Sequence, residues 1–237
     1  MALPSCPVQA LVFDLDGTLL DTLADIGHSV NTMLAECGFP VHPLDAYRGF
    51  IGEGLRMIVV RALPEAARSD PEQVERCVHR ARTCYQDNWN QETRLYDGIA
   101  SLLDAIETMP LQKAILSNKP HDLTVRYVAH YLGAWHFDAI MGQTDAFPVK
   151  PDPASALHIA GQLGVPAPAF FFVGDSMTDV NTARAAGMGP IGVTWGFKGE
   201  KPLVEGGCPV LIRHPLELVA VLRENGVRGC PAGPVLI

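Results

Sequence analysis

Short apolar runs recur along the chain, and they do not alternate with polar residues as half-exposed strands do. Such runs are typical of strands that are buried on both faces of a parallel sheet. They predict strands at residues 8–13, 113–116, 170–173, 190–193 and 210–212, with a weaker one at 139–141.

Stretches of helical periodicity lie between these runs, with apolar residues three and four positions apart. Gly133, Gly164 and Gly187 each follow one of these stretches and are typical residues for a helix end. Strands that alternate with helices form βαβ units. The sequence therefore predicts an α/β fold, with a Rossmann-like parallel sheet and helices on both faces. The helices are expected at 99–106, 123–132, 154–163 and 179–186.

Residues 20–95 break this alternation, because they contain amphipathic helical patterns and nothing with the pattern of a strand. The segment is much longer than a normal crossover between two strands. We therefore expect an all-helical cap domain, residues 21–94, inserted into an α/β core of residues 1–20 and 95–237. The alternative is that these helices simply cover the sheet. The expected cap helices span 26–37, 55–63 and 71–89, and Asp70 is the expected N-cap of the last.

Composition narrows the class of protein. The chain has 237 residues, of which 48% are hydrophobic and 19% charged, so it can bury a core and is not wholly disordered. Its net charge of −8 argues against a nucleic-acid-binding protein, because neutralising phosphates requires a basic surface. A small phosphorylated ligand is still compatible with this charge, since it needs only a local positive site.

The start of the chain and its cysteines bear on location. No Lys or Arg precedes the first apolar run, unlike in a secretory signal, and no apolar run is long enough to span a bilayer. The six cysteines are scattered without a Cys-x-x-Cys pair, which favours reduced thiols. We therefore expect a cytoplasmic protein without a membrane segment. The tail from Gly226 is rich in Gly and Pro and is expected to be irregular.

Two pairs of aspartates follow predicted strands. Asp14 and Asp16 end the first strand, where residues two positions apart face the same way. Asp175 and Asp179 follow the strand at 170–173, and they can face one site if a helix begins between them. Ligands of open α/β folds bind at the carboxyl edge of the sheet, and Mg²⁺ would offset the repulsion among such carboxylates. One such pair alone would more often mark a helix N-cap.

Two further segments carry chemistry that suits an anion. Ser117 and Asn118 follow the strand at 113–116, so a hydroxyl and backbone N–H groups are available there. Lys150 stands just before a predicted helix, in a segment that prolines stiffen on either side of Asp152. Taken alone, Ser117 would more often be a turn residue and Lys150 a solvated charge.

Four motifs occur together along the chain: DLDGTL at Asp14, LSN ending at Asn118, VKPDP around Lys150 and VGDSMTDVNTARAAG from Val173. In this order they resemble the haloacid dehalogenase superfamily and, within it, the phosphoglycolate phosphatase group. The position and helical content of residues 20–95 are similar to the mobile cap of that family.

The resemblance implies a phosphoryl transfer. Asp14 would attack phosphorus and form an aspartyl-phosphate, and Asp16 would protonate the leaving oxygen and then act as a base. Mg²⁺ would be held by Asp14, the backbone carbonyl of Asp16, and Asp175. Asp179 would lie in the outer shell and orient a metal-bound water or Lys150. The presence of Asp16 favours phosphoryl transfer over carbon–halogen cleavage, which has no alkoxide to protonate.

The resemblance also implies a phosphate site. Thr18, Ser117 and Asn118 would bind the substrate's phosphate, and Lys150 would neutralise its charge. In the cap, the Gly-rich segment at residues 50–56 would reach over the site, where Gly52 and Arg56 could meet a substrate carboxylate. A plain helix-start turn with a surface arginine is the alternative for that segment.

These inferences favour a Mg²⁺-dependent phosphomonoester hydrolase that acts on a small phosphorylated metabolite, 2-phosphoglycolate first among them. Alternatives on the same fold are a phosphatase for sugar phosphates, amino-sugar phosphates or pyrophosphate, and a phosphomutase like β-phosphoglucomutase. A non-catalytic binding protein is a third class, but it would need neither nucleophile nor acid. The chain is expected to act as a monomer or a homodimer.

Overall fold

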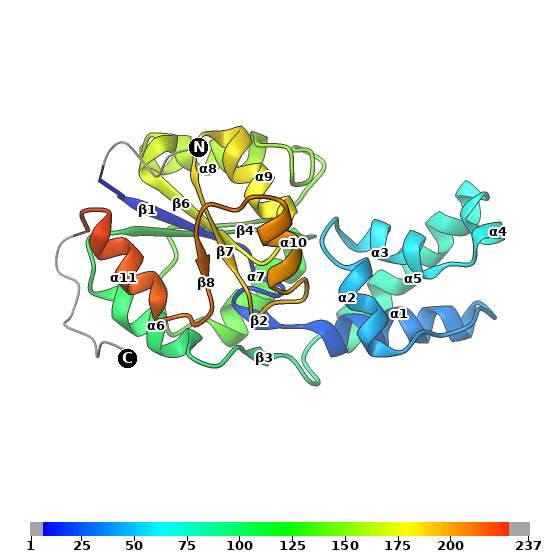
Figure 1. The fold of residues 1–237 in the computed structure, drawn as a ribbon. Helices are drawn as coiled ribbons and strands as arrows, with labels where there is room; N and C mark the ends of the chain where they lie inside the picture. The colour runs from blue at the N-terminus through cyan, green and yellow to red at the C-terminus, as the bar shows by residue number, and fades with distance from the viewer. Residues whose placement is uncertain (1–6, 228–237) are drawn as a thin grey trace.

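The computed structural model describes residues 7–227, and within them the main sheet has six strands, all parallel (Figure 1). Its strands, in the spatial order β5-β4-β1-β6-β7-β8, each lie at one of the apolar runs, so the predicted sheet is confirmed. Their bounds are β1 (Ala10–Phe13), β4 (Gln112–Pro120), β5 (Ala139–Gln143), β6 (Phe170–Gly174), β7 (Gly189–Val193) and β8 (Leu211–Ile212).

Helices cover both faces of this sheet. They are α6 (Ile99–Glu107), α7 (His121–Tyr131), α8 (Ala154–Leu163), α9 (Met177–Ala186), α10 (Glu200–Glu205) and α11 (Glu217–Glu224). Successive residues of a strand point to opposite faces. Leu11 and Phe13 accordingly join the apolar cluster that includes α6 and α11, whereas Ala10 and Val12 join the cluster that includes α8 and α9. Figure 1 shows these two pairs of helices on opposite sides of the sheet, as predicted.

Strand register brings the functional loops to one edge. β1 lies between β4 and β6, and Phe13 pairs with both Ile115 and Val173. The pairing of β1 with both neighbours therefore ends at the same level, although β4 itself continues to Pro120. Because all three strands run in the same direction, the residues beyond these last pairs lie together at the carboxyl edge of the sheet.

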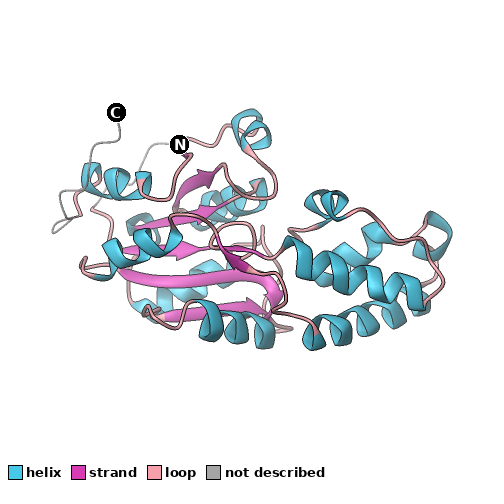
Figure 2. Ribbon diagram, turned by 90° about the horizontal axis from the view of Figure 1, so that it is seen from below, coloured by secondary structure: helices cyan, strands magenta, loops and turns pink. Residues whose placement is uncertain are grey.

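A helical part stands beyond that edge, between β1 and β4 in the sequence (Figure 2). It consists of α1 (Leu23–Glu36), a 3-10 turn (Leu44–Ala46), α2 (Tyr47–Phe50), α3 (Leu55–Ala62), α4 (Glu65–Arg68) and α5 (Pro71–Asp87). The long helices α1 and α5 pack together through buried residues such as Met33 and Cys77. The Asp70 carboxylate accepts hydrogen bonds from the backbone N–H groups of Glu72 and Gln73, so it caps α5 as predicted. The predicted helical insertion is confirmed.

The expectation that residues 20–95 contain no strand is wrong in one detail. Two short strands, β2 (Leu20–Asp21) and β3 (Arg94–Leu95), pair antiparallel where the chain enters and leaves the helical part. Two residues are too few to show an alternating pattern, so the sequence carried no signal for them. The division into a core and a cap at residues 20/21 and 94/95 falls at this pairing and stays a prediction.

Other differences concern short elements. The sequence predicted no helix at α2, α4, α10 or α11, and no 3-10 turn at Ala167–Ala169.

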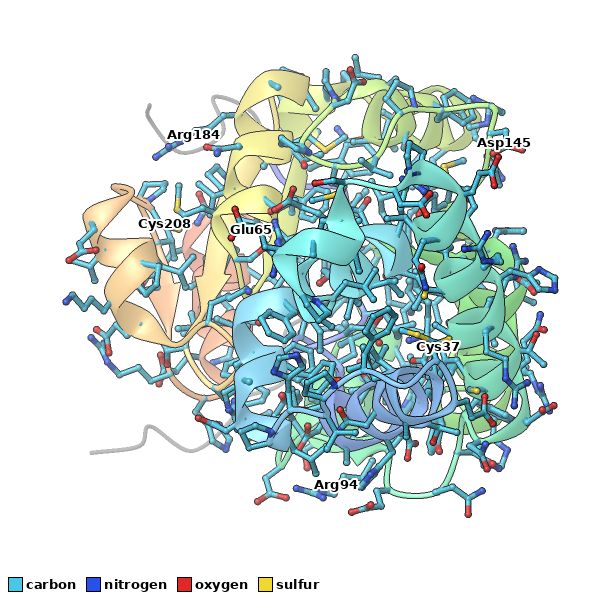
Figure 3. All side chains as sticks on the ribbon, turned by 90° about the vertical axis from the view of Figure 1, so that its right-hand side faces the viewer. Cys37, Glu65, Arg94, Asp145, Arg184 and Cys208 are labelled. Atoms are coloured by element: carbon cyan, nitrogen blue, oxygen red, sulfur yellow. The ribbon has the colours of Figure 1, made fainter. Side chains whose placement is uncertain are left out.

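No helix within residues 7–227 is both long and apolar enough to cross a membrane. Cys37, Cys77, Cys84 and Cys208 are free thiols, as expected, and Figure 3 shows Cys37 in the helical part that faces the viewer. Cys6, Cys230 and most of the tail predicted from Gly226 lie outside the described residues.

Candidate active site

The loop after β1 begins the site. The Asp14 N–H donates to the Val173 carbonyl at 2.9 Å, so the ladder with β6 continues to the first aspartate. Gly17 then turns the chain with φ of +89°, and a Cβ there would lie 2.5 Å from Oδ2 of Asp175. Only glycine suits both requirements. The turn thus lets the loop pass directly against Asp175.

Lys150 joins two of the predicted aspartates. Its Nζ lies 2.8 Å from Oδ1 of Asp14 and 2.7 Å from Oδ1 of Asp179, and it also donates to the Leu116 carbonyl at 3.1 Å. All three charged side chains are at most 10% exposed. Burial lowers the pKa of Lys150, but Asp14 and Asp179 more than offset this and raise it above its usual value. Lys150 therefore stays a cation at the bottom of the site.

Asp175 follows β6 and is held by the backbone opposite. Its Oδ2 accepts the N–H of Phe197 at 2.7 Å. The next residue, Ser176, is the N-cap of α9 and forms a capping box with Asp179. The Ser176 N–H and hydroxyl both donate to Oδ2 of Asp179. Asp179 therefore takes part in capping α9 as its N3 residue, while its other oxygen reaches Lys150.

Three of these carboxylates form a buried cluster that suits a metal ion. One oxygen each from Asp14, Asp175 and Asp179 lie within 4.8 Å of one another. Burial is the main reason that the pKa of Asp14 lies well above its ordinary value, and burial with the nearby Asp179 raises the pKa of Asp175 to about 7. A hard divalent cation that takes oxygen ligands offsets the repulsion among buried carboxylates and favours their ionised form. The donor set therefore fits Mg²⁺.

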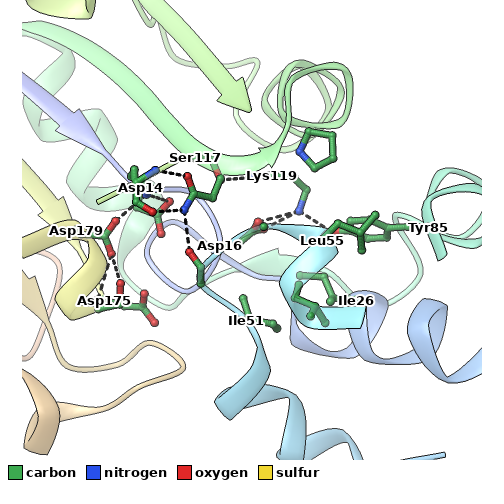
Figure 4. A pocket seen from close by; sticks show the side chains of 17 residues that line it. Asp14, Asp16, Ile26, Ile51, Leu55, Tyr85, Ser117, Lys119, Asp175 and Asp179 are labelled. Carbon is green, nitrogen blue, oxygen red and sulfur yellow. Dashed lines mark hydrogen bonds and ion pairs between the residues drawn. The ribbon is translucent and has the colours of Figure 1, made fainter. Parts of the chain in front are cut away.

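The Asp16 side chain takes no part in that cluster and points toward the helical part instead (Figure 4). Its Oδ1 accepts the hydroxyl of Thr22 at 2.8 Å, and the Nζ of Lys119 lies 2.7 and 3.0 Å from its two oxygens. Lys119 also donates to the hydroxyl of Tyr85 on α5. Burial lowers the pKa of Lys119, while Asp16 opposes that effect.

Sequence reasoning missed Lys119 as a member of the site. The available signal was its position, two residues after Ser117 and beyond the same predicted strand. Ser117 itself is 3% exposed and lines the pocket, and its Oγ accepts the N–H of Lys119 at 3.2 Å.

Asn118 lines the pocket, but its side-chain amide forms hydrogen bonds with backbone groups. Its Nδ2 donates to the carbonyls of Gly52 and Lys150 at 3.0 and 3.1 Å, and its Oδ1 accepts the N–H of Lys150 at 2.8 Å. These bonds join the lysine segment to the glycine-rich segment of the helical part. The Asn118 amide is engaged in these bonds in this structure, and its contact with a substrate phosphate stays a prediction.

Two predicted substrate residues lie outside the pocket. Arg56 pairs with Glu75, and its side chain is 51% exposed, because α3 turns Leu55 and Ile58 toward the site instead. Thr18 is 1% exposed and does not line the pocket; its carbonyl accepts the indole N–H of Trp195. Neither side chain reaches the pocket in this structure, and their contact with a substrate stays a prediction.

The pocket between the two parts has a polar floor and an apolar roof (Figure 4). The floor consists of the loops after β1 and β6, the end of β4 and Lys150. Gly52, with φ of +135°, also lines the pocket, as the sequence predicted for the cap segment. The roof comes from the helical part and consists of Ile26, Ile51, Leu55, Ile58 and Tyr85.

Comparisons with known proteins agree with this geometry. Residues 11–193 match the family model for haloacid dehalogenase-like hydrolases. A phosphoglycolate phosphatase from Pseudomonas savastanoi pv. phaseolicola is 34% identical over 89% of this chain and 78% of its own length. Another, from Thiobacillus denitrificans, is 32% identical over 84% of this chain and 88% of its own. The crystal structure of a Lactobacillus delbrueckii subsp. bulgaricus protein, 26% identical, superposes with a TM-score of 0.84 over 91% of this chain and 98% of that one.

Proposed function

The chain belongs to the haloacid dehalogenase-like hydrolases, and we propose that it is a Mg²⁺-dependent phosphatase that hydrolyses 2-phosphoglycolate to glycolate and phosphate. One observation carries the proposal. Asp14 is held by Lys150 beside two further buried carboxylates, and Asp16, two residues on, faces the same pocket from the other side. Nucleophile and acid are thus separate groups with separate partners.

In the first half of the reaction, a carboxylate oxygen of Asp14 attacks phosphorus and the ester P–O bond breaks. Asp16 gives its proton to the departing alcohol oxygen, so glycolate leaves as a neutral alcohol at that oxygen. The product on the protein is an aspartyl-phosphate at Asp14.

In the second half, Asp16 is ionised and takes a proton from a water molecule. The oxygen of that water attacks phosphorus, the bond to Asp14 breaks, and phosphate is released. Asp16 thereby recovers its proton and Asp14 its carboxylate. A single aspartate serves both halves because the proton it gives in one is the proton it regains in the other.

The remaining residues stabilise charge. Lys150 lies 2.8 Å from Asp14, so its ammonium can approach the phosphoryl oxygens, and the Ser117 hydroxyl is the nearby donor for them. Asp14, Asp175 and the backbone carbonyl of Asp16 would hold Mg²⁺, which supplies Lewis-acid polarisation of the phosphoryl group. Asp179 positions Lys150 through their 2.7 Å contact.

The helical part closes the other side of the pocket with apolar side chains. Such a roof excludes bulk water while the phosphoryl group transfers, which favours attack by Asp14 over direct hydrolysis. The substrate name is supported by the relatives from Pseudomonas and Thiobacillus, both named phosphoglycolate phosphatase. A cytoplasmic location and the oligomeric state stay predictions from the sequence.

The test is phosphate release from 2-phosphoglycolate, glucose 1-phosphate, N-acetylmuramic acid 6-phosphate and pyrophosphate, with and without Mg²⁺. Asp14→Asn, which keeps the size of the side chain, is the matched control. We expect 2-phosphoglycolate to lead by roughly a hundredfold in kcat/KM, equivalent to about 2.7 kcal/mol of discrimination. A flat panel would remove the substrate name, and activity equal to that of Asp14→Asn would overturn the phosphatase proposal.

A further inference from the structure

The two long helices of the helical part carry a pair of cysteines whose sulfur atoms are in contact. Cys37 follows the last residue of α1, Cys77 lies within α5, and their Sγ atoms are 3.9 Å apart. Both are free thiols in this structure. Cys84 and Cys208, the other cysteines in the described part of the chain, have no such sulfur contact. Two adjacent thiols on different elements are the arrangement that a disulfide requires.

The packing of α1 against α5 holds these two sulfurs together (Figure 1). Cys77 is fully buried on the apolar face of α5. Beside Cys37, the Glu36 carboxylate accepts a hydrogen bond from the Arg80 guanidinium at 2.7 Å, and Arg80 lies about one turn beyond Cys77. An ion pair between the helices therefore stands next to the thiols and fixes which residues of α1 and α5 face each other.

A disulfide requires the sulfurs to approach to about 2 Å, so one of the two residues must shift. Cys37 is the residue that can shift at little cost. It is the C-cap of α1, and nothing lies within 4 Å of the place where a Cβ on its neighbour Gly38 would be. Cys77 is held by helix on both sides, so it stays in place.

The two thiols differ in their access to solvent, and this sets the order in which they react. Cys37 is partly exposed, whereas Cys77 is fully buried. Burial, together with the adjacent Cys37, raises the pKa of the Cys77 thiol to about 11, which makes it a poor nucleophile toward a reagent in solution. A small oxidant therefore reacts with Cys37 first, and Cys77 then attacks the product.

We propose that Cys37 and Cys77 form a redox modification site, at which a low-molecular-weight disulfide such as oxidised glutathione links α1 to α5 reversibly. The Cys37 thiolate attacks one sulfur of the oxidant, whose S–S bond breaks, and one small thiol leaves. Cys77 loses its proton and attacks the Cys37 sulfur of this mixed disulfide, and the second small thiol leaves. Two protein thiols are thereby oxidised to one disulfide, and the oxidant is reduced to two thiols.

The link is expected to stabilise the helical part without obstructing the pocket. Neither cysteine lines the pocket, although Ile26 on α1 and Tyr85 on α5 do. Because α1 begins just after β2, Cys37 lies at the end of that helix that is farther along the chain from the sheet. The disulfide would close a loop of about 40 residues, which restricts the unfolded chain and so favours the folded one.

The experiment equilibrates the full chain, under native conditions, with oxidised glutathione. The remaining thiols are then alkylated, and the protein is digested with trypsin and a glutamate-specific protease. Cleavage after Glu36 and Arg76 places Cys37 in the peptide of residues 37–48 and Cys77 in that of residues 77–80, each with a single cysteine. We expect mass spectrometry to find these two peptides joined with the loss of two hydrogens, and dithiothreitol to separate them.

Two serine variants are the controls. Cys37→Ser should abolish the linked peptides. Cys208→Ser removes a thiol outside the helical part, where its Sγ donates to the Val210 carbonyl, and should leave the link unchanged. Wild type without the linked peptides would overturn the proposal. So would wild type in which Cys37 is found only as its mixed disulfide with glutathione, or joined to a cysteine other than Cys77.

Thermal melting gives a second measurement that needs no variant to fold. We expect the linked wild type to melt roughly 5–10 °C above the reduced protein, as for a disulfide across a loop of this length. A linked form that melts at or below the temperature of the reduced protein would overturn the stabilising link between α1 and α5. Neither measurement depends on catalysis, so the phosphatase proposal is tested separately.

Discussion

The charged side chains in this site differ in function because they have different ion-pair partners. Lys150 neutralises Asp14 and Asp179, whereas Lys119 neutralises Asp16. The motif residues Asp14, Asp16 and Lys150 could be named from the sequence because four motifs in order resemble one family, and the structure brings all three to one pocket. The contacts of Lys119 could not, because they depend on side chains from β4 and α5 that lie far apart in the chain.

Removal of the acid should affect substrates according to their leaving groups. Asp16→Asn should lower kcat on 2-phosphoglycolate by about 10²- to 10⁴-fold, because the alkoxide then leaves without a proton. p-Nitrophenyl phosphate needs no acid, so with this substrate the first step should persist and the second should slow. The measurement is a rapid-mixing trace, in which we expect a burst of nitrophenolate of one equivalent per site. Equal losses on both substrates without a burst would contradict the assignment.

At the scale of the elements, one residue links the two chain segments that run between the sheet and the helical part. In the sequence it looks like an ordinary acidic residue at the start of a helix. Asp25, on the first turn of α1, is 1% exposed. Its carboxylate accepts the N–H groups of Glu92 and Thr93 at 2.9 and 3.0 Å and the Thr93 hydroxyl at 2.6 Å. One side chain thus joins the outgoing chain to the returning one.

Asp25→Ala leaves these donors without their acceptor. We expect a loss of about 3 kcal/mol in the free energy of unfolding, since buried donors without partners are costly. Urea denaturation with circular dichroism measures it. Asp45→Ala is the control, because that carboxylate is exposed, and it should change stability by about 0.5 kcal/mol or less. Similar losses for the two variants would show that Asp25 does not tie the connections.

Elements with a strong apolar pattern could be predicted, and short ones could not. The runs at β1 and β6 have every residue buried, so their sequence pattern matched their surroundings. β2 and β3 have two residues each and exist because their partners are brought together by the fold. Arg56 was expected in the site because the family resemblance places the segment at residues 50–56 over it. In the structure, α3 turns Leu55 toward the pocket, and Arg56 pairs with Glu75 instead.

For the molecule as a whole, the buried carboxylates link stability to pH and to metal. Burial and the adjacent Asp179 raise the pKa of Asp175 from 3.8 to about 7. Between about pH 4 and 7 the folded protein therefore holds a proton that the unfolded chain releases, so this group makes stability fall as pH rises. Mg²⁺ requires the ionised form and should restore the lost stability.

The measurement is the melting temperature in EDTA at pH 5.5 and pH 8, for wild type and Asp175→Asn. We expect the Tm of Asp175→Asn to rise relative to that of wild type at pH 8, because the asparagine side chain cannot ionise. Adding Mg²⁺ should raise the Tm of wild type more at pH 8 than at pH 5.5 and should have less effect on the variant. A difference between the two proteins that is independent of pH would contradict this linkage.

The most direct test of the whole account is to trap the phosphorylated protein. Wild type with Mg²⁺ and 2-phosphoglycolate is quenched in acid within milliseconds, digested and analysed by mass spectrometry. We expect one phosphoryl group on the peptide that contains Asp14, more of it in Asp16→Asn, and none in Asp14→Asn. Phosphate release from 2-phosphoglycolate with no phosphoryl group on Asp14 in either wild type or Asp16→Asn would contradict the covalent mechanism on which the assignment of these residues rests.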